Sequence, residues 1–322
     1  ATKKADPVLD GLLDQWCAAN RHAIETTSGG RITVDTSGVV STALGVVSAR
    51  TIAEARTVLD RIASNPGDLR AIGRYLELVP QDLGRRGGWA DVFRDRSMVA
   101  SQGDFLDQLA SSVSLATATD DSEVDAEFRY RLKRQGPRSA AFTEVRERYL
   151  RGRNSRHHSS GLALTEVYEI IPTDKGEAAR WQALADRHGN VRRLWHGTAD
   201  PNLVSILHRG LVVPLARGSG TIHVTGRMFG DGVYLSDQST KALNYATGFW
   251  QGAASGRPSM LLADVVMGHE LRPTSRTGLE SKMASGRYQS INVRGGTCGV
   301  VNNEMIVRDP AQIQLRYLCV FA

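Results

Sequence analysis

The sequence is poor in cysteine and in aromatic residues, and it has no long apolar run. Of its 322 residues, three are cysteines, Cys17, Cys298 and Cys319, and Phe, Trp and Tyr together make up 6%. Three widely separated cysteines supply neither a disulfide framework nor a CxxC zinc pair, and they suit a reducing compartment. A transmembrane helix needs about 20 apolar residues in succession, and no segment approaches that length. The sequence therefore predicts an intracellular protein with no membrane partner.

Several catalytic signatures are also missing. There is no HExxH zinc motif, no GxSxG nucleophile elbow and no pair of carboxylates at an obvious spacing. Gly230 and Gly232 flank Asp231, but the third glycine and the strand-turn-helix order of a dinucleotide-binding loop are lacking. These absences speak against zinc peptidases, serine hydrolases and Rossmann dehydrogenases, and we expect no metal site.

What the sequence does contain is a globular composition with a basic excess. Hydrophobic residues make up 41%, and 40 Lys and Arg against 34 Asp and Glu give a net charge of +6. A length of 322 residues exceeds the roughly 100–200 residues of one domain. We therefore expect two domains. Arginines cluster at 129–138 and 146–156, where they form either a solvated face or a contact for nucleic acid.

The N-terminal third has mainly helical patterns. Apolar residues three and four positions apart predict helices over 48–63 and 69–78, and a third helix from Met98 through Leu109. The stretch 30–45, rich in Gly, Ser, Thr and Val, breaks this pattern. An acidic segment followed by an Arg-rich one marks a boundary and a first strand within 115–160. These patterns predict an all-α subdomain at 1–114.

The remainder has an α+β pattern and is expected to form a second domain at 115–322. Glu177–Arg187 has helical spacing, and alternating or short apolar runs predict strands. The predicted strands cover 164–171, 191–195, 232–235, 259–266, 305–307 and 313–321.

Three segments of this domain carry residues suited to chemistry. His196 ends a predicted strand directly before Gly197, where a side chain can face a cleft and bare backbone can approach a ligand. Taken alone, such a histidine is more often a hydrogen-bonded core residue. Glu304 begins another predicted strand, where a carboxylate is either solvated at an edge or a placed acceptor.

The third segment follows Tyr234 and predicts a helix from about Thr240 to Phe249, with Asp237 or Ser239 as its N-cap. Lys241, Ala242 and Tyr245 are three and four positions apart on that helix, so their side chains can point into one pocket. A tyrosine buried in the core explains Tyr245 equally well.

Together these segments resemble the catalytic domain of the poly(ADP-ribose) polymerases, the ADP-ribosyltransferases with a His-Tyr-Glu triad. The resemblance lies in His-Gly-Thr at 196–198, Met-Phe-Gly-x-Gly-Val-Tyr at 228–234, Lys-Ala-Leu-Asn-Tyr at 241–245 and Asn-Glu-Met-Ile-Val at 303–307, in the family's order. Upstream, Leu44-Gly-x-x-Ser48 and the run from Tyr75 to Gly84 resemble the autoinhibitory helical subdomain of DNA-damage-responsive members. The resemblance implies an ADP-ribosyltransferase fold with two packed, mainly antiparallel sheets after a helical subdomain.

The resemblance also implies that NAD is a substrate, cleaved at the nicotinamide–ribose bond. The triad would be His196, Tyr234 and Glu304. Further NAD-binding positions would be Gly197, Thr198, Asn202, Lys241, Ala242 and Tyr245, with Met228 beside the acceptor. Gly197 would hold the nicotinamide amide through its backbone and Tyr245 would stack on the ring. His196 would hydrogen-bond the adenosine ribose, and Thr198 and Asn202 would line the adenosine side.

Glu304 is the family's mark of polymerising members, so the resemblance favours poly(ADP-ribose) synthesis on protein acceptors, the chain itself included. Two departures stand out: Ala242 replaces a serine whose hydroxyl binds the nicotinamide amide, and Val212 stands where an arginine often lies near the adenine. Two alternatives stay open: a mono-ADP-ribosyltransferase of protein or nucleic acid, and a silent NAD- or ADP-ribose-binding module.

The activating signal is not visible in these residues. The sequence begins at Ala1 without a Met or an apolar signal core, which suggests part of a longer protein. DNA is therefore expected as an activator, acting through an upstream segment or through the Arg-rich stretch. The resemblance places the protein in the nucleus of a eukaryote or the cytoplasm of a bacterium.

Overall fold

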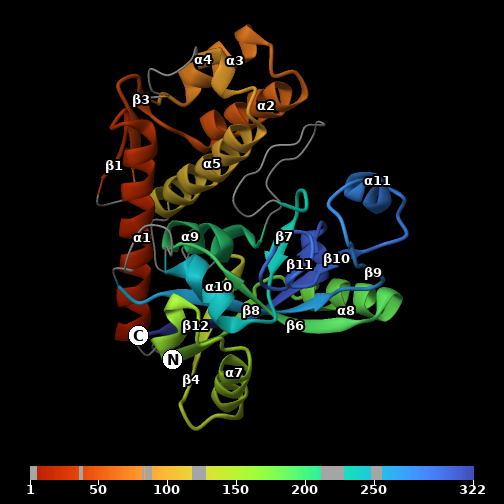
Figure 1. Ribbon diagram of the computed structural model, residues 1–322. Helices are drawn as coiled ribbons and strands as arrows, with labels where there is room; N and C mark the ends of the chain where they lie inside the picture. Colours follow the sequence, from red (N-terminus) through yellow and green to blue (C-terminus); the bar gives the residue numbers. More distant parts are fainter. Residues whose placement is uncertain are drawn as a thin grey trace. The chain divides into compact units, whose positions relative to one another are not determined.

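The computed structural model describes residues 6–35, 39–81, 83, 89–117, 128–211, 228–247 and 256–322. The chain divides into two compact units, drawn in Figure 1. The helical unit comprises residues 1–128, 200–209 and 214–224, and the sheet unit comprises 129–199, 210–213 and 225–322. The chain thus leaves the sheet unit for the helical unit at Asp200 and later returns.

The helical unit is built from helices that bury one apolar face. In α2 (Ala49–Ser64), Ser48 caps the first turn by accepting a hydrogen bond from the Thr51 backbone N–H. The buried residues of α2 recur three and four positions apart: Ile52, Ala55, Leu59 and Ile62. The unit also contains α1 (Pro7–Ser28), α3 (Leu69–Leu78), α4 (Trp89–Val92), α5 (Arg96–Thr117) and α9 (Asp200–Arg209). The three predicted helices are thereby confirmed.

A small antiparallel sheet accompanies these helices in the stretch that broke the helical pattern. It pairs β1 (Ile32–Val34) with β2 (Val40–Thr42), and β2 with β3 (Gly45–Val46). Strands of two or three residues carry too little alternation to be recognised from sequence.

Helix α9 packs within the helical unit, against α1 and α5. Gln15 Nε2 donates to Asp200 Oδ2 at 2.5 Å, and Arg209 Nη1 lies 2.6 Å from Asp107 Oδ1. The apolar residues of α9 are buried: Leu203, Val204, Ile206 and Leu207. The domain borders 1–114 and 115–322 remain a prediction about independent folding, and α9 depends on helices from the first of those segments.

The sheet unit contains two sheets, which confirm the fold class. One is antiparallel throughout, in the order β4-β5-β12-β8-β6, and the other has the order β7-β11-β10-β9 with only β9 and β10 parallel. Strand bounds are β4 Tyr130–Gln135, β5 Leu164–Pro172, β6 Val191–Gly197, β7 Val233–Leu235, β8 Ser259–Val266, β9 Glu270–Leu271, β10 Ser290–Val293, β11 Glu304–Val307 and β12 Ile313–Phe321.

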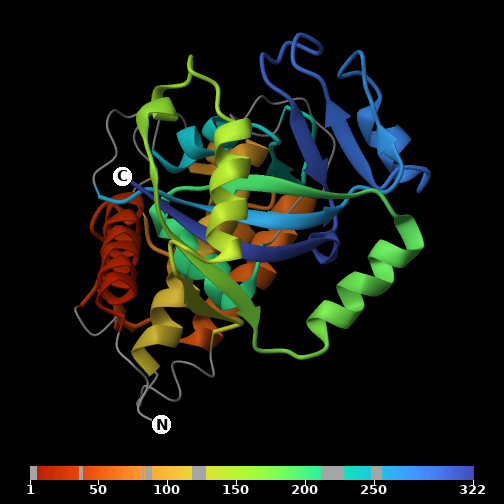
Figure 2. The ribbon, with the colours of Figure 1, turned by 90° about the horizontal axis from the view of Figure 1, so that it is seen from below.

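Helices α7 (Ala140–Arg151) and α10 (Ser239–Ala246) share one core with the five-stranded sheet. Figure 2 shows α7, in yellow-green, crossing over the strands. Its Phe142, Val145 and Tyr149 pack in the same cluster as Leu243 of α10 and strand residues such as Leu262. The unit is completed by α8 (Glu177–His188), α11 (Leu279–Ala284) and the 3₁₀ turns η1 (His158–Gly161) and η2 (Pro310–Gln312).

The two sheets are joined by one backbone bridge. Trp195 N donates to Ser236 O at 2.8 Å, and Ser236 N donates to Trp195 O at 2.9 Å. The bridge brings the end of β6 beside the end of β7. His196 and Gly197 complete β6 directly after Trp195, and Tyr234 lies on β7 two residues before Ser236. None of the helices in the described ranges is long and apolar enough to cross a membrane.

Candidate active site

His196 follows the bridge residue Trp195 on β6, and its ring is oriented by backbone. Nδ1 lies 2.9 Å from the carbonyl oxygen of Tyr234. Because a carbonyl only accepts, Nδ1 carries a proton and donates it, which leaves Nε2 for a ligand. Burial lowers the pKa of His196. A neutral ring with Nε2 as acceptor suits a hydroxyl donor such as that of a ribose.

Gly197 brings the end of β6 against the backbone of α10. A β-carbon at this position would lie 1.7 Å from the carbonyl oxygen of Ala242 and 2.5 Å from its carbonyl carbon. Both neighbours are main-chain atoms, so no side-chain movement would relieve the overlap. Only glycine permits this approach, and it places the backbone of Gly197 beside the helix that carries Lys241 and Tyr245.

Tyr234 on β7 fixes the turn that precedes it. Its hydroxyl accepts from Phe229 N at 3.0 Å and donates to Gly230 O at 2.7 Å. Gly230 has a φ of 86°, a left-handed conformation that favours glycine. Met228 begins this turn and is half-buried against the cluster that also contacts Tyr234. Tyr234 thus holds the turn in place, with Met228 at its start.

Lys241 and Glu304 form an ion pair that is largely withdrawn from water. Lys241 Nζ lies 2.5 Å from Glu304 Oε2, and the two side chains are 8% and 14% exposed. Burial raises the pKa of Glu304 despite the attraction of Lys241, and burial lowers the pKa of Lys241 despite Glu304. Each group therefore favours the charged form of the other against the effect of burial.

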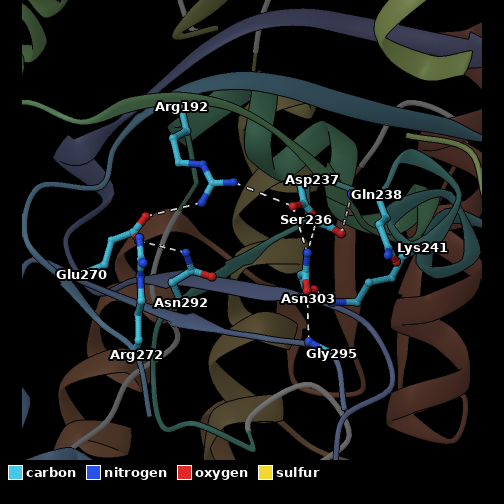
Figure 3. Close-up of polar contacts among 10 residues, drawn as sticks. All are labelled: Arg192, Ser236, Asp237, Gln238, Lys241, Glu270, Arg272, Asn292, Gly295 and Asn303. Atoms are coloured by element: carbon cyan, nitrogen blue, oxygen red, sulfur yellow. Dashed lines mark hydrogen bonds and ion pairs between the residues drawn. The ribbon is translucent and has the colours of Figure 1, made fainter. Parts of the chain in front are cut away.

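A chain of polar contacts leads away from Lys241, as Figure 3 shows. Lys241 Nζ also donates to the carbonyl oxygen of Asn303 at 2.8 Å, and Asn303 Nδ2 donates to Asp237 Oδ2 at 3.0 Å. Asp237 faces Arg192 at 3.7 Å, and Arg192 faces Glu270 at 3.4 Å. Both sheets thus contribute to the orientation of Lys241.

The helix after Tyr234 differs in detail from its prediction. Helix α10 begins at Ser239, with Gln238 as N-cap and no side-chain cap hydrogen bond. Asp237 is therefore not the N-cap; its carboxylate is engaged by Asn303 and Arg192 instead. The helix ends at Ala246, and residues 248–250, into which the predicted helix extended, lie outside the described residues.

Tyr245 presents its ring beside this pair. It lies one turn after Lys241 on α10 and is 43% exposed, unusually open for a large aromatic residue. The pKa of its hydroxyl is raised by burial and by the negative charge of Glu304. An exposed ring next to a buried carboxylate is available for stacking on a planar ligand.

The two residues predicted to line the adenosine side belong to different units. Asn202 is on α9 in the helical unit, where its Oδ1 accepts from Gln108 Nε2 of α5 at 3.3 Å. Thr198 remains in the sheet unit, half-buried after β6. Val212 lies outside the described residues.

Four residues near the site were given no role in the site by the sequence patterns. Arg192, Asp237 and Asn303 form the polar chain described above, and the fourth residue is His157. His157 Nδ1 lies 2.9 Å from Thr240 Oγ1, and its ring interacts with Asn302 and Lys241. Within the described ranges, no three His, Cys, Asp or Glu side chains are grouped to hold a metal ion.

The sequence profile of the poly(ADP-ribose) polymerase catalytic domain matches residues 139–322. The chain is 25% identical over 321 residues to poly [ADP-ribose] polymerase 1 of Gallus gallus, covering 85% of this chain and 30% of that protein. It is 28% identical over 205 residues to poly [ADP-ribose] polymerase 2 of Homo sapiens, covering 54% of this chain and 33% of that protein.

A plant relative matches the chain at a similar level of identity. The chain is 26% identical over 321 residues to poly [ADP-ribose] polymerase 2 of Zea mays, covering 85% of this chain and 47% of that protein. The chain thus spans between 30% and 47% of the length of these relatives. With more than half of its length matched by the catalytic domain, the chain belongs to the poly(ADP-ribose) polymerase catalytic-domain family.

Proposed function

We propose that the chain is an NAD-dependent ADP-ribosyltransferase that builds poly(ADP-ribose) on protein acceptors, itself included. The observation that carries this proposal is the buried Lys241–Glu304 pair at 2.5 Å, beside the approach of Gly197 to Ala242. In the reaction, the bond between nicotinamide and ribose breaks and nicotinamide leaves with the bonding electrons. An acceptor hydroxyl attacks the ribose carbon and loses its proton to water, which gives a new glycosidic bond.

Glu304 supplies the negative charge that this reaction needs. The ribose carbon becomes positively charged as nicotinamide departs, and a carboxylate in a site of low polarity stabilises that charge. The same carboxylate accepts a hydrogen bond from a ribose or acceptor hydroxyl and polarises it for attack. Lys241 keeps Glu304 ionised and oriented.

The other residues place NAD. The backbone of Gly197, which has no side chain, hydrogen-bonds the nicotinamide amide. The exposed ring of Tyr245 stacks on the nicotinamide. His196 Nε2 accepts a hydrogen bond from a ribose hydroxyl, because Nδ1 donates to the carbonyl oxygen of Tyr234. Thr198 and Asn202 line the adenosine side in this proposal, and Met228 contacts the acceptor.

The decisive experiment is incubation with labelled NAD followed by a denaturing gel. We expect a high-molecular-weight smear from the wild type that is lost in Glu304→Gln and strongly reduced in His196→Ala. Glu147→Gln, the same change at an exposed position on α7, is the matched control and should keep the smear. One discrete labelled band would instead assign a mono-ADP-ribosyltransferase, and NAD binding without transfer would assign a silent binding module.

We also propose that the helical unit restrains the enzyme until an activator, DNA in this proposal, acts on it. Deleting residues 1–114 tests this poorly, because α9 would lose the helices that cover its apolar residues. Asp107→Asn is a milder change: Asp107 pairs with both Arg56 of α2 and Arg209 of α9. We expect basal activity to rise by about two- to fivefold as the unit loosens by roughly 1–3 kcal/mol. Unchanged activity alongside a lowered melting temperature would contradict the restraint.

A further inference from the structure

The end of α7 and the segment after it concentrate positive charge. Residues 146–158 contain five arginines and one glutamate, so their formal charge is 5 − 1 = +4 in a chain whose net charge is +6. Arg151, Arg153 and Arg156 are exposed, and Arg148 is half-buried on the last turns of the helix. We call these four residues the basic rim.

The backbone that carries the basic rim is fixed to the first turn of α10. Ser239 N donates to Gly152 O, and Asn154 N donates to Thr240 Oγ1, both at 2.9 Å. Ser159 Oγ donates to Thr240 O at 2.9 Å. A β-carbon at Gly152 would lie 2.8 Å from Ser239 N, so the two segments touch through their main chains. An ordered backbone loses little entropy when its side chains bind a ligand.

The charges of the basic rim are not neutralised by the protein. In the described part of the chain, Arg151, Arg153 and Arg156 form no ion pair, and Arg148 Nε is buried without a hydrogen-bond partner. The carboxylate of Glu144, one turn before Arg148 on α7, is bound by Arg193. Burial and the positive charges of Arg193 and Arg151 lower the pKa of Arg148. Crowded like charges of this kind favour a bound anion.

The basic rim begins next to the candidate active site. His157 follows Arg156 and contacts Thr240, the residue before Lys241. On its other side His157 interacts with Asn302, two residues before Glu304. A ligand on the basic rim would therefore extend from the side of the site at which β11 and α10 both begin.

We propose that Arg151, Arg153 and Arg156 bind the pyrophosphate groups of the ADP-ribose chain that grows on the acceptor. Each ADP-ribose unit carries one pyrophosphate, and guanidinium groups bind phosphate oxygens with paired hydrogen bonds. A row of fixed arginines beside the reaction centre retains the product between additions, so that longer chains form before release. The inference rests on the proposed function, because it takes the product of that reaction as the ligand.

A binding measurement tests the site without catalysis. Fluorescence anisotropy of the full chain is recorded with a purified, end-labelled ADP-ribose oligomer of uniform length. The variant Arg151→Gln/Arg153→Gln/Arg156→Gln is compared with Arg131→Gln/Lys133→Gln/Arg138→Gln, which removes the same charge from exposed positions in and after β4 of the same unit. Melting curves of both variants confirm that they are folded.

We expect the rim variant to weaken oligomer binding at least about tenfold. The slope of log K against log salt should fall by about 2, since three phosphate contacts are lost at roughly 0.7 each. The control variant should change affinity less than about twofold. With labelled NAD, the rim variant should make shorter chains while releasing nicotinamide at the wild-type rate.

Two results would overturn the proposal. One is equal oligomer affinity in the rim and control variants. The other is equally tight, rim-dependent binding of single-stranded DNA of the same charge, which would make the rim a nucleic-acid site. If the wild type transfers no ADP-ribose at all, the proposed function fails, and the oligomer titration still decides whether the basic rim binds this polymer.

Discussion

The sheet unit holds two neighbouring sets of charges, linked by the contact between His157 and Thr240, and they are arranged in opposite ways. Around Lys241, each charge has a partner: Glu304, Asn303 and Asp237 follow one another, and Arg192 joins Asp237 to Glu270. Along the basic rim, Arg151, Arg153 and Arg156 form no ion pair in the described part of the chain, and Arg148 Nε has no hydrogen-bond partner.

The difference separates two tasks. Charges enclosed by protein partners are pre-oriented, and they act on a transition state without reorganising. Charges left open to solvent are completed by a ligand, and they contribute affinity rather than chemistry. Substitutions around Lys241 should therefore change kcat, whereas substitutions in the basic rim should change product binding.

The largest effect is expected for Glu304→Gln. The amide keeps the shape but removes the charge, so kcat should fall by at least about 100-fold. KM for NAD should stay within about threefold, because Gly197 and Tyr245 remain in place. Steady-state release of nicotinamide provides both constants. If KM for NAD rose by a similar factor while kcat stayed unchanged, Glu304 would bind NAD rather than stabilise the transition state.

Gly197→Ala should come next. The new methyl group would meet the carbonyl oxygen of Ala242, a main-chain atom, so β6 or α10 must shift. We expect NAD affinity to fall by about tenfold or more, measured by calorimetry with the folded variant. Gly161→Ala, where a β-carbon has open space, is the control and should bind NAD normally.

Lys241→Met should change the pH dependence of activity. Lys241 lowers the pKa of Glu304 while burial raises it, so removing the lysine raises that pKa further. The active carboxylate is lost as pH falls through its pKa, so the acid limb of kcat should move to higher pH than in the wild type. Rates measured across the pH range check this, and an unmoved limb would mean that another group controls it.

Asp237→Asn distinguishes positioning from catalysis. Asparagine retains one oxygen for Asn303 but loses the charge facing Arg192. We expect kcat to fall by a few fold with KM unchanged. Arg272→Gln is the control, because Arg272 pairs with Glu270, which lies at the opposite end of this chain of polar contacts from Lys241. A change in KM without a change in kcat would remove Asp237 from the positioning role.

The smallest effect is expected for Ala242→Ser. A hydroxyl at this position restores a hydrogen bond to the nicotinamide amide, worth about 0.5–1.5 kcal/mol. Inhibitors that mimic nicotinamide should therefore bind about two- to tenfold more tightly, as measured by competition. Equal affinity in both proteins would show that the missing serine is compensated elsewhere.

The sequence predicted the elements well and the side-chain partnerships poorly. The apolar patterns gave β5 and β8 nearly to the residue, because both strands are long and β8 is a nearly continuous buried run. Asp237 was misassigned as a helix cap because aspartate before a helix is the usual cap signal. Its real partner, Asn303, is distant in sequence, and a pairing between the adjoining ends of the neighbouring strands β7 and β11 leaves no local pattern.

The unit to which Asn202 belongs is a second feature that the sequence could not predict. The motif order places it with the NAD residues, and the sequence says nothing of the unit to which its helix belongs. The amphipathic pattern of α9 fits packing against any apolar surface, and the surface it meets is that of α1 and α5. Its position depends on contacts made more than eighty residues earlier in the chain, such as that with Gln108.

The approach of Gly197 to Ala242 has a consequence for inhibitor resistance. Every single-nucleotide change that alters a glycine codon introduces a side chain with a β-carbon or a stop codon. At this position each such side chain would collide with the main chain of α10. Resistance to a compound that hydrogen-bonds to the backbone of Gly197 is therefore not expected to arise by substitution of Gly197 itself.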